Sequence, residues 1–501
     1  MKDYLTEQEL KRFSFKNIRG LQDRRFQATV RYMLPETKFY NRLFKERNID
    51  PYDLESVRDW QKKGLPLVKK SVFRKRPKDF LVQPRGNKKD IFKKYISFIN
   101  HQHKRKAAKT AFSALTNRKK LQKEITDFFH PKMPAFSGGS EDVPVPVMIT
   151  ARQKMANMQE IVKIICSFVF RHTKGNTVGL NLFPYAPHLG WHTVHMCFEH
   201  GANLNLCTAG GGVLPTSKLV ELAGKSNANI IAGMSDYIRN RFLDEAIKKG
   251  IRLPETVVFV NGAGRILDKE RDAIKEKAKK IGVKKAVILD VFGASEFKEG
   301  LMPECSTHSG FHNIAPLTNI IKTISMDPAE DRKDLVEEWK FTKNRGYASV
   351  WNINGAGTLL EGFLVGDMVD GVVERRCPSC GLNVQRIKNI DRIRNVEAQL
   401  AVMGIAEGKV KGSTINLSAL RDMIINLEGI NEAQIVLKKL EKGDELIIRP
   451  VFSRKDKKLA EKIKVLCKDN FEVTPKVEPK RIEDLSSPKQ LKFHGILIED
   501  G

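Results

Sequence analysis

Long apolar runs are missing from this chain of 501 residues. No stretch reaches the roughly 18–20 apolar residues of a membrane span, and residues 1–8 contain no apolar signal-peptide core. The seven cysteines have irregular spacing, which is not the spacing of a disulfide framework. We therefore expect a cytoplasmic protein that has no membrane span.

A Walker A sequence, an internal repeat and a low-complexity tract are also absent from the sequence. The first absence removes the P-loop as an alternative ATP site. The chain is well beyond the size of a single core, and 41% of its residues are hydrophobic. We therefore expect two or more domains, each with a core of its own.

Acidic residues are scarce relative to basic ones, with 59 Asp and Glu against 88 Lys and Arg. The net charge of +29 favours anionic partners such as nucleic acid, a membrane surface or a polyphosphate. Residues 103–123 hold eight Lys or Arg and no acid. Only Phe112 interrupts them, whereas RNA-binding segments interleave aromatics with their basic residues. We interpret the stretch as a solvated helix face and do not expect nucleic acid as a partner. The alternative is a binding site for anionic lipid or for a CoA phosphate.

The residue pattern changes twice along the chain. Residues 1–130 have a mostly helical pattern, and Asp50 and Pro51 are typical of a capped turn. After Pro131 short apolar runs at 229–233, 256–260 and 286–290 alternate with amphipathic stretches such as 268–281. This alternation predicts an α/β fold with parallel strands, crossover helices and ligand loops at the carboxyl ends of the strands.

The C-terminal fifth of the chain has a different pattern. We expect helices at 417–427 and 457–470 and strands at 433–438, 444–451 and 471–477. Those five elements predict a small α+β sandwich. The sequence therefore predicts two domains, a large one at 1–389 and a small one at 390–501.

Four metal-binding residue types form two pairs in the sequence. Cys305 and His312 are separated by six residues. Cys377 and Cys380 form a short knuckle followed by a glycine, and a loop of 64 residues separates this knuckle from His312. A Cys₃His set is a complete tetrahedral zinc site, and four protein ligands make it structural rather than catalytic. A redox pair is the alternative for the knuckle, but such pairs open a helix after a strand. His308 competes with His312 as the fourth ligand.

Six groups of residues, taken in order, resemble the motifs of the phenylacetate–CoA ligase family within the acyl-adenylate-forming superfamily. They are Asn48-Ile-Asp-Pro51 with Leu65-Pro-Leu-Val-Lys69, Phe292-Gly-Ala-Ser-Glu296, Glu304-Cys305 with Gly310-Phe-His312, Gly366-Asp367, Cys377–Cys380-Gly, and Asp391-Arg392. The resemblance covers nearly the whole chain in patches and favours His312 as the zinc ligand. It implies a large multi-layer adenylate-forming domain with a helical N-terminal extension, plus a small mobile C-terminal lid domain.

The resemblance also implies roles for the residues of the Phe292–Glu296 motif. The ring of Phe292 would stack on adenine next to Gly293, and Ser295 would contact the α-phosphate. Glu296 would hold Mg²⁺, a hard cation that binds carboxylate and phosphate oxygens.

The remaining nucleotide-binding residues follow from the same resemblance. Asp367 would accept hydrogen bonds from both ribose hydroxyls, and Arg392 would bind the ribose or a phosphate. Gly262 and Ala263, which follow a predicted strand, would let the backbone approach the nucleotide closely.

Two parts of the chain depart from the family pattern. The phosphate loop contains Ser137, Gly138, Gly139 and Ser140, whose amides and hydroxyls can hold a phosphate, but the acidic pair Glu141-Asp142 follows them. Gly264 stands where the family has an acid. Near the C-terminus, Lys489 matches the family's catalytic lysine in register, with Lys492 as the alternative.

The resemblance implies an ATP-dependent acyl or aryl ligase. A carboxylic acid would react with Mg·ATP to give an acyl-adenylate, and a thiol, in the first place that of CoA, would then displace AMP. Lys489 would act while the adenylate forms. The alternatives are transfer to a protein or carrier thiol, and a catalytically weakened homologue that binds a nucleotide or RNA. The oligomeric state stays open, with a homodimer as one option.

Overall fold

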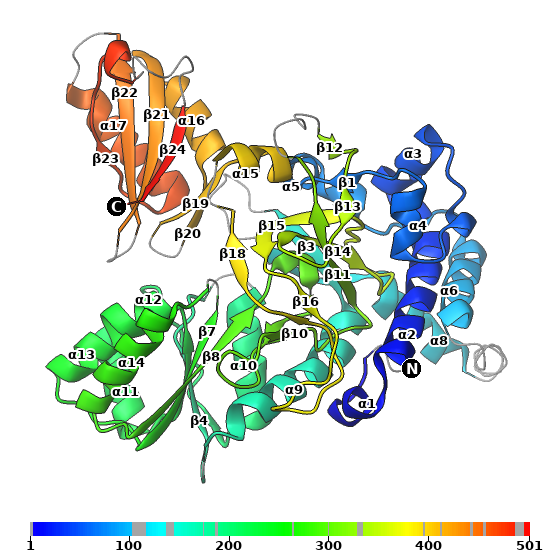
Figure 1. The fold of residues 1–501 in the computed structure, drawn as a ribbon, viewed down its shortest axis with the longest axis horizontal. Coiled ribbons are helices and arrows are strands. Elements are labelled where there is room, and N and C mark those ends of the chain that lie inside the picture. Colours follow the sequence, from blue (N-terminus) through cyan, green and yellow to red (C-terminus); the bar gives the residue numbers. More distant parts are fainter. Residues whose placement is uncertain are drawn as a thin grey trace.

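The computed structural model describes residues 4–102, 117–136, 145–173, 175–185, 189–262, 265–298, 300–327, 334–393, 396–410, 413–440, 444–453, 457–485 and 495–500. The architecture is α/β, as the sequence predicts, with a large N-terminal part and a small C-terminal part (Figure 1). None of the described helices has the length and apolar character that a membrane crossing requires.

Helices dominate the first 130 residues within the described ranges. They are α1 (Glu7–Arg12), α2 (Phe15–Ala28), α3 (Lys38–Glu46), α4 (Val57–Lys62), α5 (Lys70–Lys75), α6 (Lys88–Gln102) and α8 (Arg118–Phe129). The predicted capped turn is confirmed, because the backbone amide of Tyr52 donates to the Asp50 carboxylate at 2.9 Å, at the start of a 3₁₀ turn.

A six-stranded sheet forms one half of the large part, in the order β5-β4-β6-β7-β8-β9. Its strands are β4 (Val178–Asn181), β5 (Leu204–Asn205), β6 (Ile230–Gly233), β7 (Thr256–Gly262), β8 (Lys285–Phe292) and β9 (Met302–Pro303). All but β9 are parallel, which confirms the three strands expected in this region. The carboxyl ends of β7 and β8 therefore lie at the same edge of the sheet.

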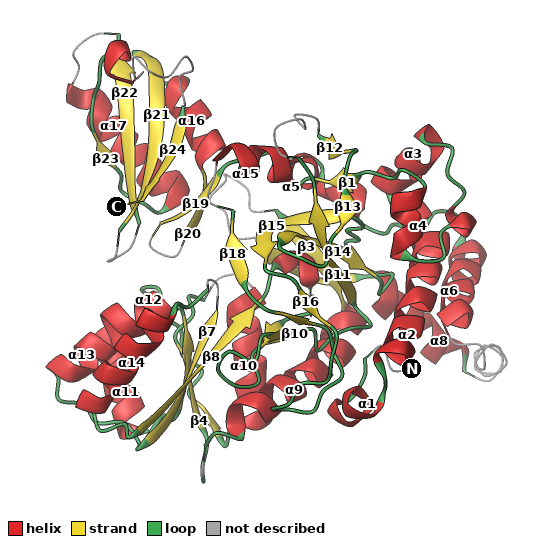
Figure 2. Ribbon diagram, viewed as in Figure 1, coloured by secondary structure: helices red, strands yellow, loops and turns green. Residues whose placement is uncertain are grey.

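Helices cover both faces of this sheet (Figures 1 and 2). Alternate residues of each strand face opposite sides, so Ile230 packs with α9 (Gln159–Phe170) and α10 (Leu189–Gly201). Ile231 packs on the other side with α11 (Thr216–Lys225), α13 (Leu243–Lys248) and α14 (Asp268–Lys280). The short apolar runs in the sequence are thus strands buried on both faces.

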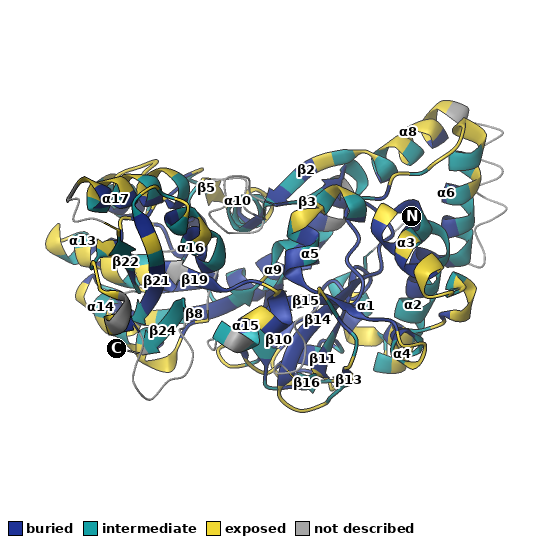
Figure 3. Cartoon of the chain, turned by 90° about the horizontal axis from the view of Figure 1, so that it is seen from above, coloured by how far each residue is buried: buried dark blue, intermediate teal, exposed yellow. Residues whose placement is uncertain are grey.

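A second, seven-stranded sheet carries most of the remaining core of the large part. Its long strands are β11 (Asn319–Ser325), β14 (Gly346–Asn352) and β15 (Phe363–Val369), which pair antiparallel. Every residue of β14 is buried (Figure 3). The short strand β18 (Ile390–Arg392) pairs with the end of β15.

The small part has a separate hydrophobic core. It contains α16 (Leu417–Ile425), β21 (Ile430–Lys439), β22 (Glu445–Phe452), α17 (Lys457–Phe471), β23 (Lys476–Val477) and β24 (Ile496–Asp500). The sheet order is β23-β22-β21-β24. The first four of these elements match the expected ones.

Two features of the small part differ from the sequence expectation. The strand expected at 471–477 is reduced to Lys476–Val477, because α17 continues through Phe471, which is buried in the core, and Glu472 then has a φ of 54°. Strand β24, which was not expected, pairs parallel with β21.

The two parts join through α15 (Val396–Met403) and the hairpin of β19 (Glu407–Val410) and β20 (Ser413–Asn416). Val402, Met403 and Ile405 belong to the core of the large part, whereas Ala406 belongs to that of the small part. The change of core therefore falls between residues 405 and 406. Helix α15 contacts both parts, since Met403 belongs to the core of the large part and Val396 packs against that of the small part.

Candidate functional site

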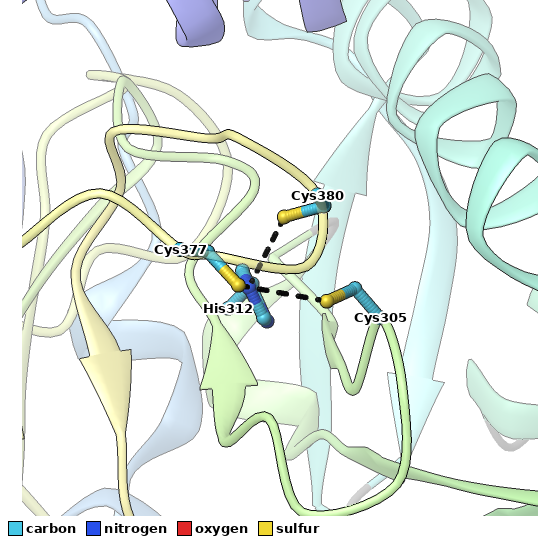
Figure 4. Close-up of side chains that lie close together, drawn as sticks. All are labelled: Cys305, His312, Cys377 and Cys380. Atoms are coloured by element: carbon cyan, nitrogen blue, oxygen red, sulfur yellow. Dashed lines mark hydrogen bonds between the residues drawn. The ribbon is translucent and has the colours of Figure 1, made fainter.

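Cys305, His312, Cys377 and Cys380 come together in the structure (Figure 4). One donor atom from each residue lies within 4.8 Å of the other three, and all four residues are buried. The Sγ atoms of Cys305 and Cys377 are 3.7 Å apart, and Cys380 Sγ lies 3.4 Å from His312 Nε2. Three sulfurs and one imidazole nitrogen at this spacing form a donor set that fits a tetrahedral Zn²⁺ ion.

Two loops from distant parts of the sequence build the cluster. Cys305 follows β9 and His312 lies in β10 (Phe311–His312), while the knuckle lies between β16 (Val372–Val373) and β17 (Arg386–Ile387). Strand β17 pairs with β10 and β16, which holds the two loops together. The knuckle closes with a hydrogen bond of 2.9 Å from the Gly381 amide to the Cys377 carbonyl, at a glycine with a φ of 75°.

His312, not His308, contributes the imidazole. His312 Nδ1 lies 2.9 Å from the Gly310 carbonyl oxygen, so this nitrogen carries the proton and Nε2 faces the sulfurs. The His308 side chain is exposed, and its Nε2 lies 3.2 Å from Asp268 Oδ1. The competing candidate from the sequence is therefore outside the cluster.

The electrostatics of the cluster favour a thiolate. The pKa of Cys305 is lowered to about 2, first because of its hydrogen bond with Cys380 and also because of the one with His312, against the opposite effect of burial. Burial acts to lower the pKa of His312, but its hydrogen bonds with Cys305 and Cys377 outweigh burial and raise this pKa to about 9. The thiolate is the form of cysteine that binds a metal.

The predicted nucleotide-binding residues on β7 and β8 are neighbours. Gly262, at the end of β7, pairs with Val291 of β8, and Phe292 follows directly. The hydroxyl of Ser295 donates to the carbonyl oxygen of Phe136 at 2.9 Å, and Phe136 immediately precedes the predicted phosphate loop. The motif that starts at Phe292 therefore lies beside the place where that loop begins.

Gly293 and Phe292 link this motif to the cysteine cluster. A Cβ on Gly293 would lie 2.2 Å from Leu301 Cδ2, so a larger residue here would require the Leu301 side chain to move. The Phe292 ring lies 6.1 Å from that of Phe311, the residue next to His312. Strand β9, which leads to Cys305, pairs with β8 at Phe292. The cysteine cluster thus supports the loops beside the predicted adenine site.

Glu296 lies in a buried turn next to Ser295. Its side chain is 3% exposed, and its Oε1 has no hydrogen-bond partner among the described residues. Oε1 lies 3.9 Å from Lys70 Nζ. A buried carboxylate oxygen that accepts no hydrogen bond is free to bind a cation. Glu296 is therefore suitably placed for its predicted role as a Mg²⁺ ligand.

Asp367 and Arg392 lie opposite each other on β15 and β18. Gly366 has a φ of 94°, and a Cβ there would lie 2.1 Å from Met403 Sδ, so a glycine is required. Arg265, just beyond the end of β7, forms an ion pair of 2.9 Å with Asp391. This ion pair connects the predicted ribose-binding residues to the edge of the parallel sheet.

A polar cavity of about 330 Å³ lies between this ion pair and the cysteine cluster. Its lining includes Arg265, Asp268, His308, Phe311 and Lys388. The cavity therefore lies beside Arg265 of the ion pair and beside Phe311, the residue before His312.

Sequence reasoning missed a set of buried polar residues beneath this edge. Asp290, on β8, accepts hydrogen bonds from Asn261 Nδ2 at 2.7 Å and from the Ile266 amide at 3.3 Å. Burial, as the largest cause, raises the pKa of Asp290 to about 7. Glu304, in the Glu-Cys motif, accepts from Arg271 at 3.0 Å and from the Asp290 amide at 2.9 Å. The only sequence signal for Asp290 was its place at the end of an apolar run.

Several predicted residues lie outside the described ranges. They are Ser137, Gly138, Gly139, Ser140, Glu141, Asp142, Ala263, Gly264, Lys489 and Lys492, together with most of the basic stretch. The side chain of Arg392 is also not described. For these residues the roles remain predictions from the sequence.

His195 and Glu199 form a second, smaller group with Cys207. His195 Nε2 lies 3.7 Å from Glu199 Oε1, and the Asn205 side-chain amide lies 3.3 Å from His195 Nδ1. The amide oxygen of Asn205 accepts from the Cys207 amide, so its nitrogen faces Nδ1 and the imidazole proton belongs on Nε2. That tautomer favours a contact with Glu199 over metal binding.

The large parallel sheet, the second sheet and the small C-terminal part together form the fold of adenylate-forming ligases. The structure is similar to that of 2-hydroxyisobutyryl-CoA ligase in complex with 2-HIB-AMP and CoA in the thioesterification state, with a TM-score of 0.67 at 15% identity over 97% of this chain and 89% of the other. The postadenylation state of that ligase with R3-HIB-AMP gives a TM-score of 0.51 at 15% identity, over the same shares of the two chains. Its open conformation with 2-HIB-AMP and CoA gives 0.50 at 15% identity over 96% and 90%.

These similarities establish the fold, and the predicted fold class is confirmed. No protein-family model and no curated protein matches the chain.

Proposed function

We propose that this protein is an AMP-forming ligase that joins a carboxylic acid to a thiol. A carboxylate oxygen attacks the α-phosphorus of ATP, and the bond from that phosphorus to the β-bridging oxygen breaks, so that pyrophosphate leaves. The sulfur of a thiol, in the first place that of CoA, then attacks the acyl carbon. The carbon–oxygen bond to AMP breaks, and the thiol proton passes to solvent.

The observation that carries the proposal is the meeting of separate sequence motifs in one region. The end of β7 at Gly262, the Phe292–Glu296 motif and the β15–β18 pair of Asp367 and Arg392 are connected by strand pairing and by the Arg265–Asp391 ion pair. Ligands of open α/β sheets bind at such an edge, outside the carboxyl ends of the strands. The protein of similar fold named above is itself a CoA ligase, in complex with 2-HIB-AMP and CoA in one state and with R3-HIB-AMP in another.

Each residue would have a distinct task. Phe292 would stack on adenine, and Gly262 with Ala263 would let the backbone approach it. Asp367 would bind the ribose hydroxyls, since a carboxylate accepts two charge-assisted hydrogen bonds. Arg392 would bind ribose or phosphate.

The phosphate end of the nucleotide would involve other residues. Ser295 and the 137–140 loop would contact phosphate oxygens, and Glu296 would bind Mg²⁺, which supplies positive charge to the phosphates. Lys489 would approach the α-phosphate while the adenylate forms and would stabilise the charge that develops there.

The cysteine cluster would hold a structural Zn²⁺ ion. All four ligands would come from the protein, which leaves no coordination position for a substrate or water. Its place beside Phe311 and Phe292 favours a role in holding the adenine-binding loops in position.

The motif resemblance favours a phenylacetate–CoA ligase-like enzyme, and hence an aryl or acyl acid as the substrate. Transfer to a protein or carrier thiol is the second candidate. A weakened homologue that only binds a nucleotide or RNA is the third, because Glu141 and Asp142 follow the phosphate-loop glycines.

An acid-dependent ATP–pyrophosphate exchange assay with a panel of carboxylic acids tests the proposal. At least one acid should support exchange in the unaltered protein, and Asp367→Ala should abolish it because ribose binding is lost. Asp370→Ala is a matched control, since Asp370 follows β15 but contacts Asn389 and Arg345 instead. Absence of exchange with every acid would remove the ligase proposal and favour the nucleotide-binding homologue.

A further inference from the structure

Two buried cations and two buried carboxylates meet where the small part joins the large one. Lys70 and Arg74 are one turn apart on α5, and Glu407 is the first residue of β19. Lys70 Nζ lies 3.4 Å from Glu407 Oε2 and 3.9 Å from Glu296 Oε1, and Arg74 also donates to Glu407. The four side chains are between 2% and 8% exposed.

Glu407 lies at the start of the small part, whereas its partners lie in the large part. The core of the small part begins at Ala406, one residue before Glu407. Lys70, Arg74 and Glu296 belong to elements of the large part. The Glu407 carboxylate can therefore stay between the two cations only while the small part is docked in the observed arrangement.

The segment that joins the two parts packs closely against α5 near Glu407. Gly404 has a φ of 72°, and a Cβ there would lie 2.1 Å from Ser71 Oγ on α5. The Gln399 side chain donates to the Glu407 carbonyl at 3.1 Å and accepts from its amide at 2.8 Å, which holds the start of β19 against α15. The contact between α15, β19 and α5 is thus a defined interface (Figure 1).

Glu407 is one of two carboxylates close to Lys70 in the observed arrangement. Without Glu407, Glu296 is the remaining carboxylate within 4 Å of Lys70 among the described side chains. Buried ion pairs contribute little to net stability, but removing one partner leaves a buried charge that is costly. If the small part leaves, another anion can take the place of Glu407 beside Lys70 and Arg74.

We propose that Lys70 and Arg74 form a binding site for the phosphate oxygens of a nucleoside triphosphate or of pyrophosphate, and that Glu407 is its competing internal anion. This inference rests on the proposed function. Lys70 contacts the residue next to Ser295, the predicted α-phosphate ligand. The predicted phosphate loop carries an acidic pair, so cations from another element are needed there.

The competition links phosphate binding to the position of the small part. A bound triphosphate neutralises the two cations and releases Glu407, so the small part undocks. Departure of pyrophosphate exposes the cations again, and Glu407 returns. The observed docked arrangement is similar to the thioesterification state of the hydroxyisobutyryl-CoA ligase, with a TM-score of 0.67 against 0.51 for the postadenylation state.

Binding of inorganic pyrophosphate, measured by calorimetry without acid or thiol, tests this inference. Glu407→Gln should raise the affinity roughly tenfold, because the competing carboxylate is gone. Lys70→Met should lower the affinity by a similar factor. Glu432→Gln is the matched control, since Glu432 forms an ion pair with Arg421 within the small part and should leave pyrophosphate affinity unchanged.

Hydrogen exchange supplies a second readout that is independent of activity. Pyrophosphate should increase amide exchange of residues 396–410 in the unaltered protein but not in Lys70→Met. In Glu407→Gln, exchange there should already be fast without pyrophosphate. A purely structural role for Glu407 predicts lower stability with no gain in pyrophosphate affinity, and that result would overturn the inference.

The two proposals can fail separately. Acid-dependent exchange together with unchanged pyrophosphate affinity in Glu407→Gln removes only the competing-anion site. Increased affinity in Glu407→Gln without exchange for any acid supports the phosphate site and removes the ligase.

Discussion

At the scale of single residues, Asp290 illustrates how the fold sets the chemistry of a side chain. Its carboxylate lies beneath the edge where the nucleotide motifs meet and accepts hydrogen bonds from Asn261 and Ile266. These bonds favour the ionised form, but burial outweighs them and raises the pKa from 3.8 to about 7. Asp290 is therefore half protonated near neutral pH.

Asp290→Asn should change how the stability of the protein depends on pH. The folded state holds the Asp290 proton up to about pH 7, whereas the unfolded state releases it near pH 4. The stabilisation is therefore full below pH 4 and is lost as the pH rises through 7. Urea unfolding at pH 5 to 8 should show that the parent loses free energy of unfolding relative to Asp290→Asn as pH rises. Curves that run parallel for the parent and Asp290→Asn would contradict this, and Asp370→Asn, at a partly exposed site, is the control.

At the scale of elements, the cysteine knuckle and the β9–β10 loop act as one unit. Neither loop has a core of its own, and the short strands β10, β16 and β17 contribute few backbone hydrogen bonds. The four converging donors add a further connection between the two loops. A metal ion at this point would therefore contribute to folding free energy rather than to catalysis.

The purified protein should contain about one zinc ion per chain, and chelation should lower its melting temperature. Cys377→Ser should lose the metal and melt earlier, while activity per folded molecule changes less. His308→Ala should keep its zinc, because that side chain points to Asp268. Metal analysis that finds no zinc in protein prepared without chelators would remove this assignment.

At the scale of the whole molecule, the residues of the proposed reaction belong to two parts, each with a hydrophobic core of its own. Asp367 lies in β15 of the large part, whereas Lys489 belongs to the C-terminal segment before β24. A residue of the large part keeps its contact with the nucleotide in both half-reactions. A residue of a part that rotates is present in only one of them.

Lys489→Ala should therefore reduce pyrophosphate exchange by roughly 10²–10³-fold, as for loss of a preorganised charge-stabilising group. Thioester formation from a supplied acyl-adenylate should be largely unchanged, whereas Asp367→Ala should impair both steps. Lys476→Ala, at an exposed site of the small part, serves as the control. The same pattern in Lys492→Ala instead would move the assignment to that lysine, and loss of both steps in Lys489→Ala would contradict the division.

Much of this arrangement was predictable because it depends on local sequence. The short, mostly apolar runs at 256–260 and 286–290 predicted strands β7 and β8, and four ligand-type residues at characteristic spacing identified the cysteine cluster. The contact of Lys70 with Glu407 joins residues 337 positions apart, and no periodicity reports such a pair. The burial that raises the pKa of Asp290 likewise depends on the packed fold and not on its neighbours in sequence.

The separation of the two cysteine loops also determines when their cluster can be completed during synthesis. Cys305 and His312 leave the ribosome first, and 64 residues, including β11, β14 and β15, follow before the knuckle. The emerging chain therefore holds only half of a ligand set until Cys380 is exposed. Strands β11, β14 and β15 precede the knuckle in the chain, so they can pair before the second half of the ligand set has been synthesised.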